Sequence, residues 1–378
     1  MNTQKDTILI LDNSPSITGA YKSILSATEA LQDKYTFIFA LQSSQLASVF
    51  SNQKNAAIHL PFLEIQKSWK LLFYFPVLMI NSFRLLKIIK KQHVRIIHIN
   101  DLYNMCGIIV KILNPRIKLI YHIRLLPTSY AKRLYSIWKR LIEKYADEII
   151  CVSETVASNF SKKRTTVIFD SIDFAKPIEN IDLDQKSNKF TILYLANYVS
   201  GKGHKQAIEA FNKVFRLLNN AQLLFFGGTL DKHKNEQFKE RLVNYADELG
   251  LTKHITFNSF AENPEQEVTK ADLMLNFSES ESFSMTTLEA LVYGTPIIVT
   301  ECGGPSEIVE HTKSGLLVPV NNITAMAEAI VKLANDLDLR NSIIINGKER
   351  VLSKFEFSNQ VALLRKVYLR LLNNSQLN

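Results

Sequence analysis

The sequence is poor in cysteine, tryptophan and glycine, and it has no long apolar segment. Its 378 residues include 3 Cys, 2 Trp, 12 Gly and 10 Pro. Cys106, Cys151 and Cys302 lie far apart without the spacing of metal ligands, which argues against a disulfide framework and for a reducing compartment. The longest apolar run, residues 71–80, is about half of the ~20 residues that span a bilayer. No signal peptide precedes the first apolar stretch, so we expect a cytoplasmic protein without a transmembrane helix.

Positive charge is concentrated in the first half of the chain. Residues 1–180 carry 24 Lys and Arg against 13 Asp and Glu, whereas residues 181–378 carry 21 against 23. Much of the excess lies on aromatic-rich amphipathic stretches, at residues 69–75, 83–91 and 130–144. Such stretches are typical of helices on an anionic bilayer, although a helix packed on a sheet with a solvated basic rim has the same composition. We expect the first domain to lie on the inner face of the membrane. No nucleic-acid motif accompanies the charge, so we expect no nucleic-acid partner.

Alternating strand and helix patterns predict an α/β protein with parallel sheets. The chain length favours two domains. In the first half, strands are predicted at 7–11, 35–40, 56–60, 94–99 and 118–123, with helices at 21–31 and 105–113. In the second half, strands are predicted at 190–195, 222–226, 255–257, 272–277 and 297–300, with helices from 206 and at 284–293, 323–335, 339–354 and 359–373. The polar, aperiodic residues 175–189 between the halves are predicted to be a linker.

The segment from 272 to 300 reads as a strand, a loop, a helix and a second strand. Gly294 stands at the position of a helix C-cap, and Pro296 prevents the helix from continuing. In parallel sheets, ligands bind beyond the carboxyl ends of the strands, where helix N-termini favour anions. Glu281 in the loop and Glu289 in the helix are acceptor-only carboxylates that suit a ligand rich in hydroxyl groups. Carboxylates for sugar hydroxyls beside amides for phosphate predict a nucleotide-sugar site, unless both glutamates are ordinary surface residues.

This segment resembles the signature of the GT4 family of retaining glycosyltransferases, also called glycosyl transferases group 1. The matching residues run from Glu281 to Pro296 (ESFSMTTLEALVYGTP) and continue with Gly303-Gly304-Pro-Ser-Glu307. The resemblance implies the GT-B fold, in which two Rossmann-like domains face each other across a cleft and a C-terminal helix returns to the first domain. We expect an acceptor-side domain at 1–175, a nucleotide-sugar-binding domain at 189–355 and the returning helix at 356–378.

The resemblance also implies roles for residues of the second domain. Glu281 would accept from a sugar hydroxyl and Glu289 from the ribose. The backbone of Ser282, Phe283, Ser284 and Met285 would support the sugar and the phosphate. Ser284 replaces the usual glycine, and because serine is a good helix N-cap, the change should be tolerated.

The turn after the strand 190–195 is the part of the family site that grips the diphosphate. Lys202 matches the family lysine and would stabilise the leaving group. Asn197 stands where the family has an arginine, so it brings no charge, and Lys205 or Arg124 could assist Lys202.

In the first domain, the resemblance implies ligand contacts for Gly19 and His122, and their place at or beside a strand end suggests contacts for His98 and Arg124. Gly19 is what remains of the glycine pair that approaches the donor phosphate. His122, at the end of the strand 118–123, would contact the donor sugar or its phosphate. His98 would support the site or contact the acceptor or a phosphate, and Arg124 would meet the acceptor or a phosphate. For each histidine, a purely structural role is the alternative. The segment 167–173 matches a family pattern that usually has Asn where this chain has Asp170.

Two Asp-x-Asp sequences raise the question of a metal, because that motif binds metal in the other major glycosyltransferase fold. Asp182 and Asp184 fall in the predicted linker, and Asp336 and Asp338 fall in a helical or turn region. Neither context is the end of a buried strand, so we expect no required metal or cofactor.

These features predict a retaining glycosyltransferase that takes its sugar from a UDP- or GDP-sugar. The basic first domain suggests a lipid-linked saccharide acceptor in the synthesis of a bacterial surface polysaccharide, such as capsule, O-antigen or exopolysaccharide. The alternatives are a nucleotide-sugar epimerase of the same fold, a soluble sucrose- or glycogen-type synthase, and a non-catalytic nucleotide-sugar-binding subunit.

Overall fold

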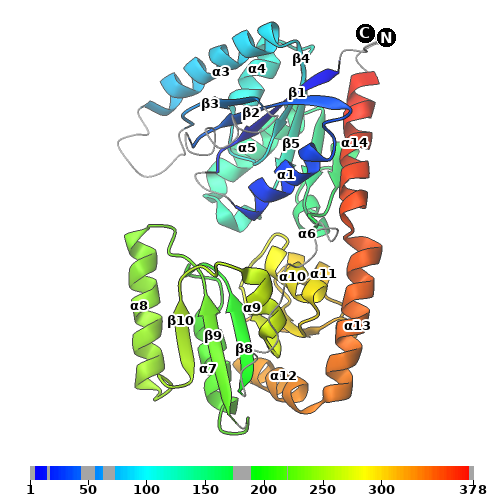
Figure 1. The fold of residues 1–378 in the computed structure, drawn as a ribbon. Coiled ribbons are helices and arrows are strands. Elements are labelled where there is room, and N and C mark those ends of the chain that lie inside the picture. Colours follow the sequence, from blue (N-terminus) through cyan, green and yellow to red (C-terminus); the bar gives the residue numbers. More distant parts are fainter. Residues whose placement is uncertain are drawn as a thin grey trace. The chain divides into compact units, whose positions relative to one another are not determined.

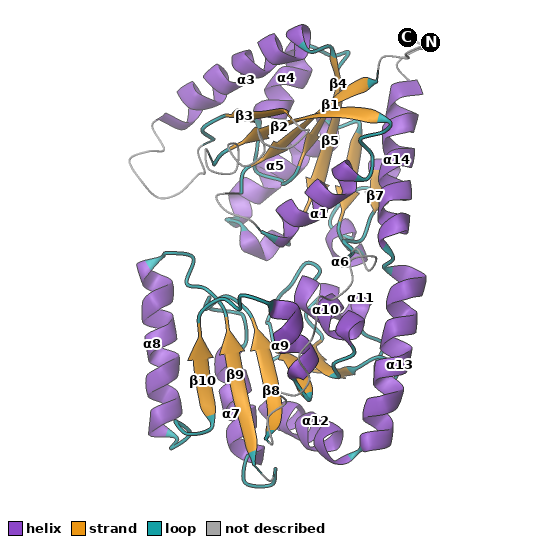
Figure 2. Ribbon diagram, in the orientation of Figure 1, coloured by secondary structure: helices purple, strands orange, loops and turns teal. Residues whose placement is uncertain are grey.

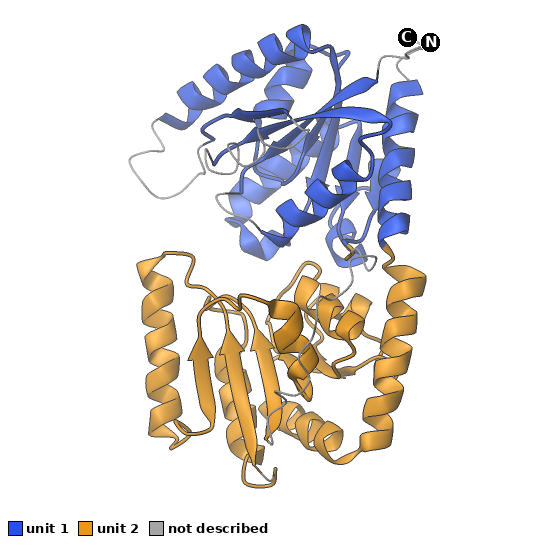
Figure 3. Cartoon of the chain, viewed as in Figure 1, with its two compact units in different colours: residues 1–170, 357–378 blue, residues 171–356 orange. Residues whose placement is uncertain are grey.

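The computed structural model describes residues 5–14, 18–43, 56–62, 73–172, 189–218 and 220–373. They form two compact units, shown in Figure 3: unit 1 comprises Met1–Asp170 and Phe357–Asn378, and unit 2 comprises Ser171–Glu356. The chain therefore passes between the units twice, after Asp170 and after Glu356. Of the predicted linker, only Lys189 lies among the described residues.

Unit 1 is built on a parallel sheet of seven strands, visible in Figure 1. The strands are β1 (Asp6–Asp12), β2 (Tyr35–Leu41), β3 (Ala56–His59), β4 (Val94–Ile99), β5 (Lys118–Ile123), β6 (Glu148–Cys151) and β7 (Thr165–Val167). Their order is β3-β2-β1-β4-β5-β6-β7. The direction of winding reverses between β1 and β4, which is where open parallel sheets bind ligands.

Helices flank the unit 1 sheet. They are α1 (Gly19–Glu29), α3 (Tyr74–Lys91), α4 (Cys106–Leu113), α5 (Lys132–Tyr145), α6 (Glu154–Ala157) and α14 (Phe357–Asn373), with short 3-10 turns at Pro127–Ser129 and Lys162–Arg164. α3 packs against α4 and α4 against α5, whereas α14 packs against α1 and β4. The last helix therefore belongs to the first unit, as the fold prediction requires. Residues 74–80 of the apolar run and the basic stretch 83–91 lie in one helix, α3; residues 71–72 fall outside the described part of the chain. The composition of residues 130–144 suggested a helix that lies on a membrane, but Trp138 in this stretch is buried within unit 1.

Unit 2 contains a second parallel sheet, of six strands. They are β8 (Phe190–Leu195), β9 (Ala221–Phe226), β10 (Ile255–Asn258), β11 (Leu273–Asn276), β12 (Ile297–Thr300) and β13 (Leu316–Val318), in the order β10-β9-β8-β11-β12-β13. Figure 2 shows the helices around this sheet. They are α7 (His204–Val214), α8 (His233–Glu248), α9 (Pro264–Lys270), α10 (Met285–Tyr293), α11 (Gly304–Ile308), α12 (Ile323–Asn335) and α13 (Leu337–Lys354). Here the winding reverses between β8 and β11.

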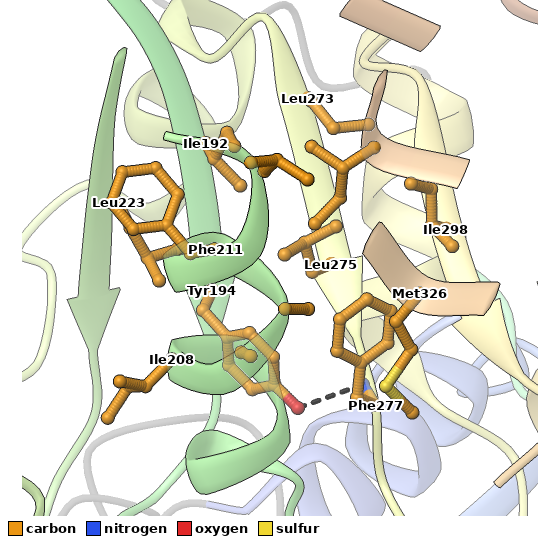
Figure 4. Packing of buried hydrophobic residues seen from close by; sticks show 14 of the residues in the cluster. Ile192, Tyr194, Ile208, Phe211, Leu223, Leu273, Leu275, Phe277, Ile298 and Met326 are labelled. Carbon is orange, nitrogen blue, oxygen red and sulfur yellow. Dashed lines mark hydrogen bonds between the residues drawn. The ribbon is translucent and has the colours of Figure 1, made fainter. Parts of the chain in front are cut away.

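The core of unit 2 lies between this sheet and its helices. Figure 4 shows Phe211 of α7 and Met326 of α12 among buried side chains of β8, β9 and β11. Tyr194 and Phe277 join this core, and a dashed line marks the hydrogen bond from the Phe277 amide to the Tyr194 hydroxyl. The apolar side chains of these strands therefore form the core between the sheet and its helices. The buried Tyr194 hydroxyl connects β8 to the residue that follows β11.

Most of the predicted elements are present with small shifts at their ends. α7 begins at His204, two residues earlier than expected, because Gly203 has a φ of 75° and turns the chain directly into the helix. Gly294 caps α10 with a φ of 77°, which confirms the predicted helix end. Within the described part of the chain, no helix combines the length and apolarity needed to cross a bilayer.

Candidate active site

The turn that follows β8 holds Lys202 in a fixed position. Tyr194 donates from its hydroxyl to the Lys202 carbonyl oxygen at 2.5 Å and accepts from the Phe277 amide at 2.8 Å. A Cβ at Gly203 would stand 2.1 Å from the Phe277 carbonyl oxygen, and the φ there is positive. Only glycine therefore fits this close approach. The turn is held against the end of β11 by a tyrosine that the sequence motifs did not indicate.

The Lys202 ammonium lies beside the Glu281 carboxylate of the loop after β11. Lys202 Nζ is 2.9 Å from Glu281 Oε1, and Asn276 Nδ2 donates to Glu281 Oε2 at 2.9 Å. Burial alone would raise the pKa of Glu281, but the Lys202 charge and the hydrogen bonds to the carboxylate outweigh burial and lower that pKa. The Lys202 and Glu281 side chains are 34% and 16% exposed. The structure thus presents an ammonium and an ionised carboxylate together, both within reach of solvent.

The glycine pair of the motif has a packing role. Glu281 N donates to Cys302 O at 3.1 Å, and Gly304 N donates to Glu281 O at 2.8 Å. A Cβ on Gly304 would stand 2.2 Å from the Cα of Phe283. Phe283 is buried against Phe355, with ring centroids 5.9 Å apart. The missing side chain at Gly304 therefore allows the Glu281 loop to lie against α11.

Ser284 begins α10 in a backbone conformation that favours glycine. Its φ is 100°, a region that costs other residues roughly 1–3 kcal/mol. Its hydroxyl accepts from the Thr287 amide at 3.3 Å and from Asn276 Nδ2 at 2.9 Å. The predicted N-cap is confirmed, and the positive φ explains why the related sequences usually have glycine here. The cap and the end of β11 together hold the serine in place.

The N-terminus of α10 offers donors to an anion. Met285 and Thr286 are the first residues of the helix, where backbone N–H groups have no acceptor within the helix. Ser282 lies half-buried in the loop just before. This end of the helix therefore suits a phosphate beside the Glu281 carboxylate.

A pocket of about 230 Å³ adjoins α10, with all of its lining in unit 2. Its walls include Asn197, Gly227, Phe260, Thr286 and Glu289. The Phe260 ring is 63% exposed and covers Gly228, where a Cβ would stand 2.1 Å from the ring. Asn197 Oδ1 accepts from the Gly228 amide at 3.2 Å, which fixes its side chain in the wall. The pocket thus combines an exposed aromatic ring, a carboxylate and an amide.

Two histidines meet within unit 1 at the carboxyl ends of β4 and β5. His98 Nε2 lies 3.2 Å from His122 Nδ1, and the two ring centroids are 5.3 Å apart. Burial, followed by the charge of Arg124, lowers the pKa of His98 to about 3 and that of His122 well below its ordinary value. Both rings are therefore neutral at pH 7. Both ring nitrogens of His98 have partners, the Tyr368 hydroxyl and His122 Nδ1, so in this structure His98 supports its neighbour.

Arg124 is committed to partners inside unit 1. It forms a salt bridge with Asp170, and its Nε donates to Asn100 Oδ1 at 2.9 Å. Its charge is paired and its Nε already donates within unit 1, so the structure gives no support to the expectation that Arg124 meets an acceptor or a phosphate. The family pattern usually has asparagine at the position of Asp170, and here the Asp170 carboxylate neutralises the Arg124 charge. Sequence reasoning could not reveal the pair, because its members are 46 residues apart.

Gly19 is the first residue of α1, at the carboxyl end of β1. Thr18 caps this helix by accepting from the Tyr21 amide at 3.2 Å. The preceding residues 15–17 lie outside the described part of the chain. Gly19 therefore stands at a helix N-terminus next to the winding reversal of unit 1, where its proposed approach to a phosphate remains a prediction.

Asp101 is a functional candidate that the sequence did not single out. It follows β4, and its Oδ1 accepts from the Tyr130 hydroxyl at 2.8 Å and from the Leu102 amide at 2.6 Å. Burial, helped by the nearby Asp12, raises the pKa of Asp101 to about 7 in spite of these hydrogen bonds. The signal that could have found it is its place directly after a buried strand.

No group of three or more His, Cys, Asp and Glu among the described residues is arranged to hold a metal ion. Asp336 has a structural role, since its Oδ1 accepts from the Leu339 amide at 2.8 Å and caps α13. Asp182 and Asp184 lie outside the described residues. The second Asp-x-Asp sequence is therefore explained by a helix cap.

Two doubly wound α/β units and a last helix that returns to the first unit define the GT-B fold. The solved structure of the Anabaena protein HepE in complex with UDP-glucose is similar to this chain, with a TM-score of 0.81. The similarity covers 96% of this chain and 99% of that one at 18% sequence identity.

The chain belongs to the family 4 glycosyltransferases. The family model described as Glycosyltransferase Family 4 matches residues 40–176, and the model for glycosyl transferases group 1 matches residues 176–350. Among curated relatives, the capsular polysaccharide biosynthesis glycosyltransferase CapM of Staphylococcus aureus is 26% identical over 66% of this chain and 70% of its own length. An uncharacterised glycosyltransferase of Methanocaldococcus jannaschii is 29% identical over 77% of this chain and 80% of its own length. The protein is therefore a glycosyltransferase.

Proposed function

We propose that this glycosyltransferase moves a sugar from a UDP- or GDP-sugar to a saccharide acceptor, with retention, in the synthesis of a surface polysaccharide. The observation that carries the donor assignment is the pocket beside α10, which brings an exposed aromatic ring and a carboxylate together. CapM, named for capsular polysaccharide biosynthesis, supports the assignment to polysaccharide synthesis.

The donor would lie along the carboxyl edge of the unit 2 sheet. Phe260 would stack on the base, and Glu289 would accept from the ribose hydroxyls. The diphosphate would meet the N-terminus of α10 and the Lys202 ammonium. Glu281, ionised and 2.9 Å from Lys202, would accept from a hydroxyl of the sugar. Each group supplies the charge or the hydrogen-bonding capacity that its part of the ligand needs.

Catalysis would come mainly from charge stabilisation on the departing nucleoside diphosphate. Lys202 would be the cation at this position, and Asn197 could add a hydrogen bond without a charge. The acceptor hydroxyl would attack from the face that the diphosphate leaves, with a phosphate oxygen taking its proton. We keep the family assignment of His122 to the donor sugar or its phosphate as a proposal. The reaction as proposed requires no metal or other cofactor.

Donor recognition can be tested with a panel of UDP- and GDP-sugars. We expect release of nucleoside diphosphate from one donor in the presence of a lipid extract from the source membranes. Phe260→Ala should weaken nucleotide binding about 5- to 150-fold, because stacking a base on an aromatic ring contributes ~1–3 kcal/mol. Glu289→Gln should also weaken binding of the nucleotide. Calorimetric titration with UDP and GDP measures both losses.

The control for the donor pocket is Leu337→Ala, which changes an exposed apolar residue of unit 2 outside the pocket. It should bind nucleotide as the wild type does. Equal affinity of the Phe260→Ala variant and this control would refute the pocket assignment. Interconversion of the donor sugar without transfer would refute the proposed reaction.

We propose that the acceptor is carried on a lipid and that unit 1 contacts an anionic membrane through α3. The exposed side of this helix is apolar in its first half, at Phe75, Met79, Ile80 and Phe83, and basic in its second half, at Arg84, Lys87, Lys90 and Lys91. Apolar side chains would enter the headgroup boundary while the cations meet anionic lipid. No acidic residue interrupts α3. The basic and the exposed apolar side chains of α3 would therefore both contact the anionic membrane.

The membrane proposal predicts a change in vesicle binding. Replacing both Phe75 and Phe83 with serine should lower binding to vesicles containing phosphatidylglycerol at least about tenfold, because each phenylalanine would bury up to ~1.5–3 kcal/mol of apolar surface. The two side chains are 72% and 51% exposed, so folding should be unaffected. Sedimentation with vesicles measures the effect. Wild-type binding should be weaker to purely phosphatidylcholine vesicles.

A matched control replaces Ile345 and Leu352 with serine. These α13 residues of unit 2 are 66% and 59% exposed, and their loss should leave vesicle binding unchanged. If the α3 variant sediments as the wild type does, α3 is not the contact.

A further inference from the structure

A chain of buried side chains connects α14 to His122. The Tyr368 hydroxyl lies 2.8 Å from His98 Nδ1, and His98 Nε2 lies 3.2 Å from His122 Nδ1. All three side chains are buried in unit 1. The last helix therefore reaches the end of β5 through two ring systems.

The direction of these hydrogen bonds follows from Arg124. Its Nη2 lies 3.4 Å from His122 Nδ1, and a guanidinium can only donate. His122 Nδ1 is therefore an acceptor, and because the ring is neutral, its proton is on Nε2. His98 must then donate from Nε2 and accept at Nδ1, so the Tyr368 hydroxyl must be the donor. The His122 Nδ1 lone pair is then shared by two donors, Arg124 and His98, and one arrangement of protons is consistent with every contact in the chain.

This arrangement leaves one donor without an acceptor. His122 Nε2 is buried and has no hydrogen-bond partner within the described part of the chain. An unpaired buried donor is unfavourable and is uncommon in folded proteins. It is expected where a ligand supplies the missing oxygen. The position, at the carboxyl end of a parallel strand, is one where ligands bind.

A second path from α14 holds the Arg124 side of His122. Gln360 Nε2 donates to Ser23 Oγ at 2.8 Å, and Ser23 donates to Asp170 Oδ1 at 2.5 Å. Asp170 in turn pairs with Arg124. Two separate paths from α14 therefore converge on the same atom, His122 Nδ1.

We propose that Tyr368 is a positioning residue, which acts through His98 to hold His122 as an Nε2–H donor toward a hydroxyl or phosphate oxygen of the substrate. On this view, α14 is part of the substrate site as well as the segment that returns the chain to unit 1. The expected effect on turnover rests on the proposed function, whereas the expected tautomer of His122 follows from the hydrogen bonds alone.

Tyr368→Phe tests the proposal, because it removes the hydroxyl and keeps the ring that packs on Tyr35 and Phe37. Tyr35→Phe is the matched control. Tyr35 lies in the same cluster with its ring centroid 5.6 Å from that of Tyr368, and its hydroxyl is buried without a hydrogen-bond partner among the described residues. Long-range ¹H–¹⁵N spectra of the full chain report which imidazole nitrogen carries the proton.

In the wild type and in Tyr35→Phe, we expect His122 to be protonated at Nε2. In Tyr368→Phe, His98 loses its donor at Nδ1 and should populate both tautomers. The fraction of His122 protonated at Nε2 should then fall, although Arg124 still favours that form, and kcat/KM should fall about five- to tenfold, as expected for one lost hydrogen bond. An unchanged His122 tautomer in Tyr368→Phe would overturn the positioning role. A shifted tautomer with unchanged kcat/KM would uphold the connection and instead remove His122 from the proposed reaction.

Discussion

Lys202→Ala should lower kcat by about 10²- to 10³-fold while changing donor affinity far less. The reason is that charge develops on the departing diphosphate as the glycosidic bond breaks, so a fixed cation stabilises the transition state more than the bound donor. The structure holds this cation in a turn whose conformation depends on Gly203 and the buried Tyr194 hydroxyl. Asn197 brings no charge to replace it. The rate of nucleoside diphosphate release gives kcat, and calorimetric titration with the donor gives its affinity.

Lys213→Ala is the matched control for this experiment. Lys213 is an exposed lysine at the far end of the same helix, α7, and its loss should change neither quantity. Loss of Lys202 should also raise the pKa of Glu281, because the ammonium is the main charge that keeps that carboxylate ionised against its burial. Unchanged turnover in Lys202→Ala would remove the lysine from the mechanism.

Arg124→Met should destabilise unit 1 by about 3–5 kcal/mol, because it leaves the Asp170 carboxylate buried without its cation. Both side chains of this salt bridge are less than a tenth exposed. The double variant Arg124→Met with Asp170→Asn should recover much of the loss, since no uncompensated charge then remains. Asp170→Asn alone should also be destabilising. Removing one partner of this salt bridge should therefore cost more stability than removing both.

Tryptophan fluorescence during urea unfolding measures this effect for unit 1 alone. The chain has 2 Trp, Trp69 and Trp138, and both fall in unit 1. The half-exposed pair of Arg95 and Asp6 serves as the control, because Arg95→Met should cost no more than about 1 kcal/mol for a partly solvated ion pair. Equal losses for the two arginines, or a double variant no more stable than Arg124→Met, would contradict the prediction.

The motif residues of unit 2 were predictable because they are close in sequence. Glu281 and Glu289 lie eight residues apart on one loop and one helix, so local patterns fix their relation. The N-cap at Ser284 and the C-cap at Gly294 follow from the same local rules. The hydrogen bond from Asn276 to the Ser284 hydroxyl was not predictable, because it joins the end of β11 to the start of α10.

The roles of the polar residues in unit 1 could not be read in this way. The sequence placed His98, His122 and Arg124 at or beside strand ends and assigned His122 to the donor, but it could not show which of the three has a free group for a ligand. The structure separates them: His98 is enclosed by Tyr368, Arg124 is paired with Asp170, and His122 retains one unpaired nitrogen. Each distinction depends on a partner between 24 and 270 residues away.

From the sequence by itself came the class of fold, the family and the donor-side residues, because the periodicity of apolar residues and the short spacing of the motif are local properties of the chain. Tertiary structure decided which charged groups are free to meet a substrate. That depends on burial and on partners brought together from distant segments, since a buried charge or donor must be satisfied by whatever the fold places next to it.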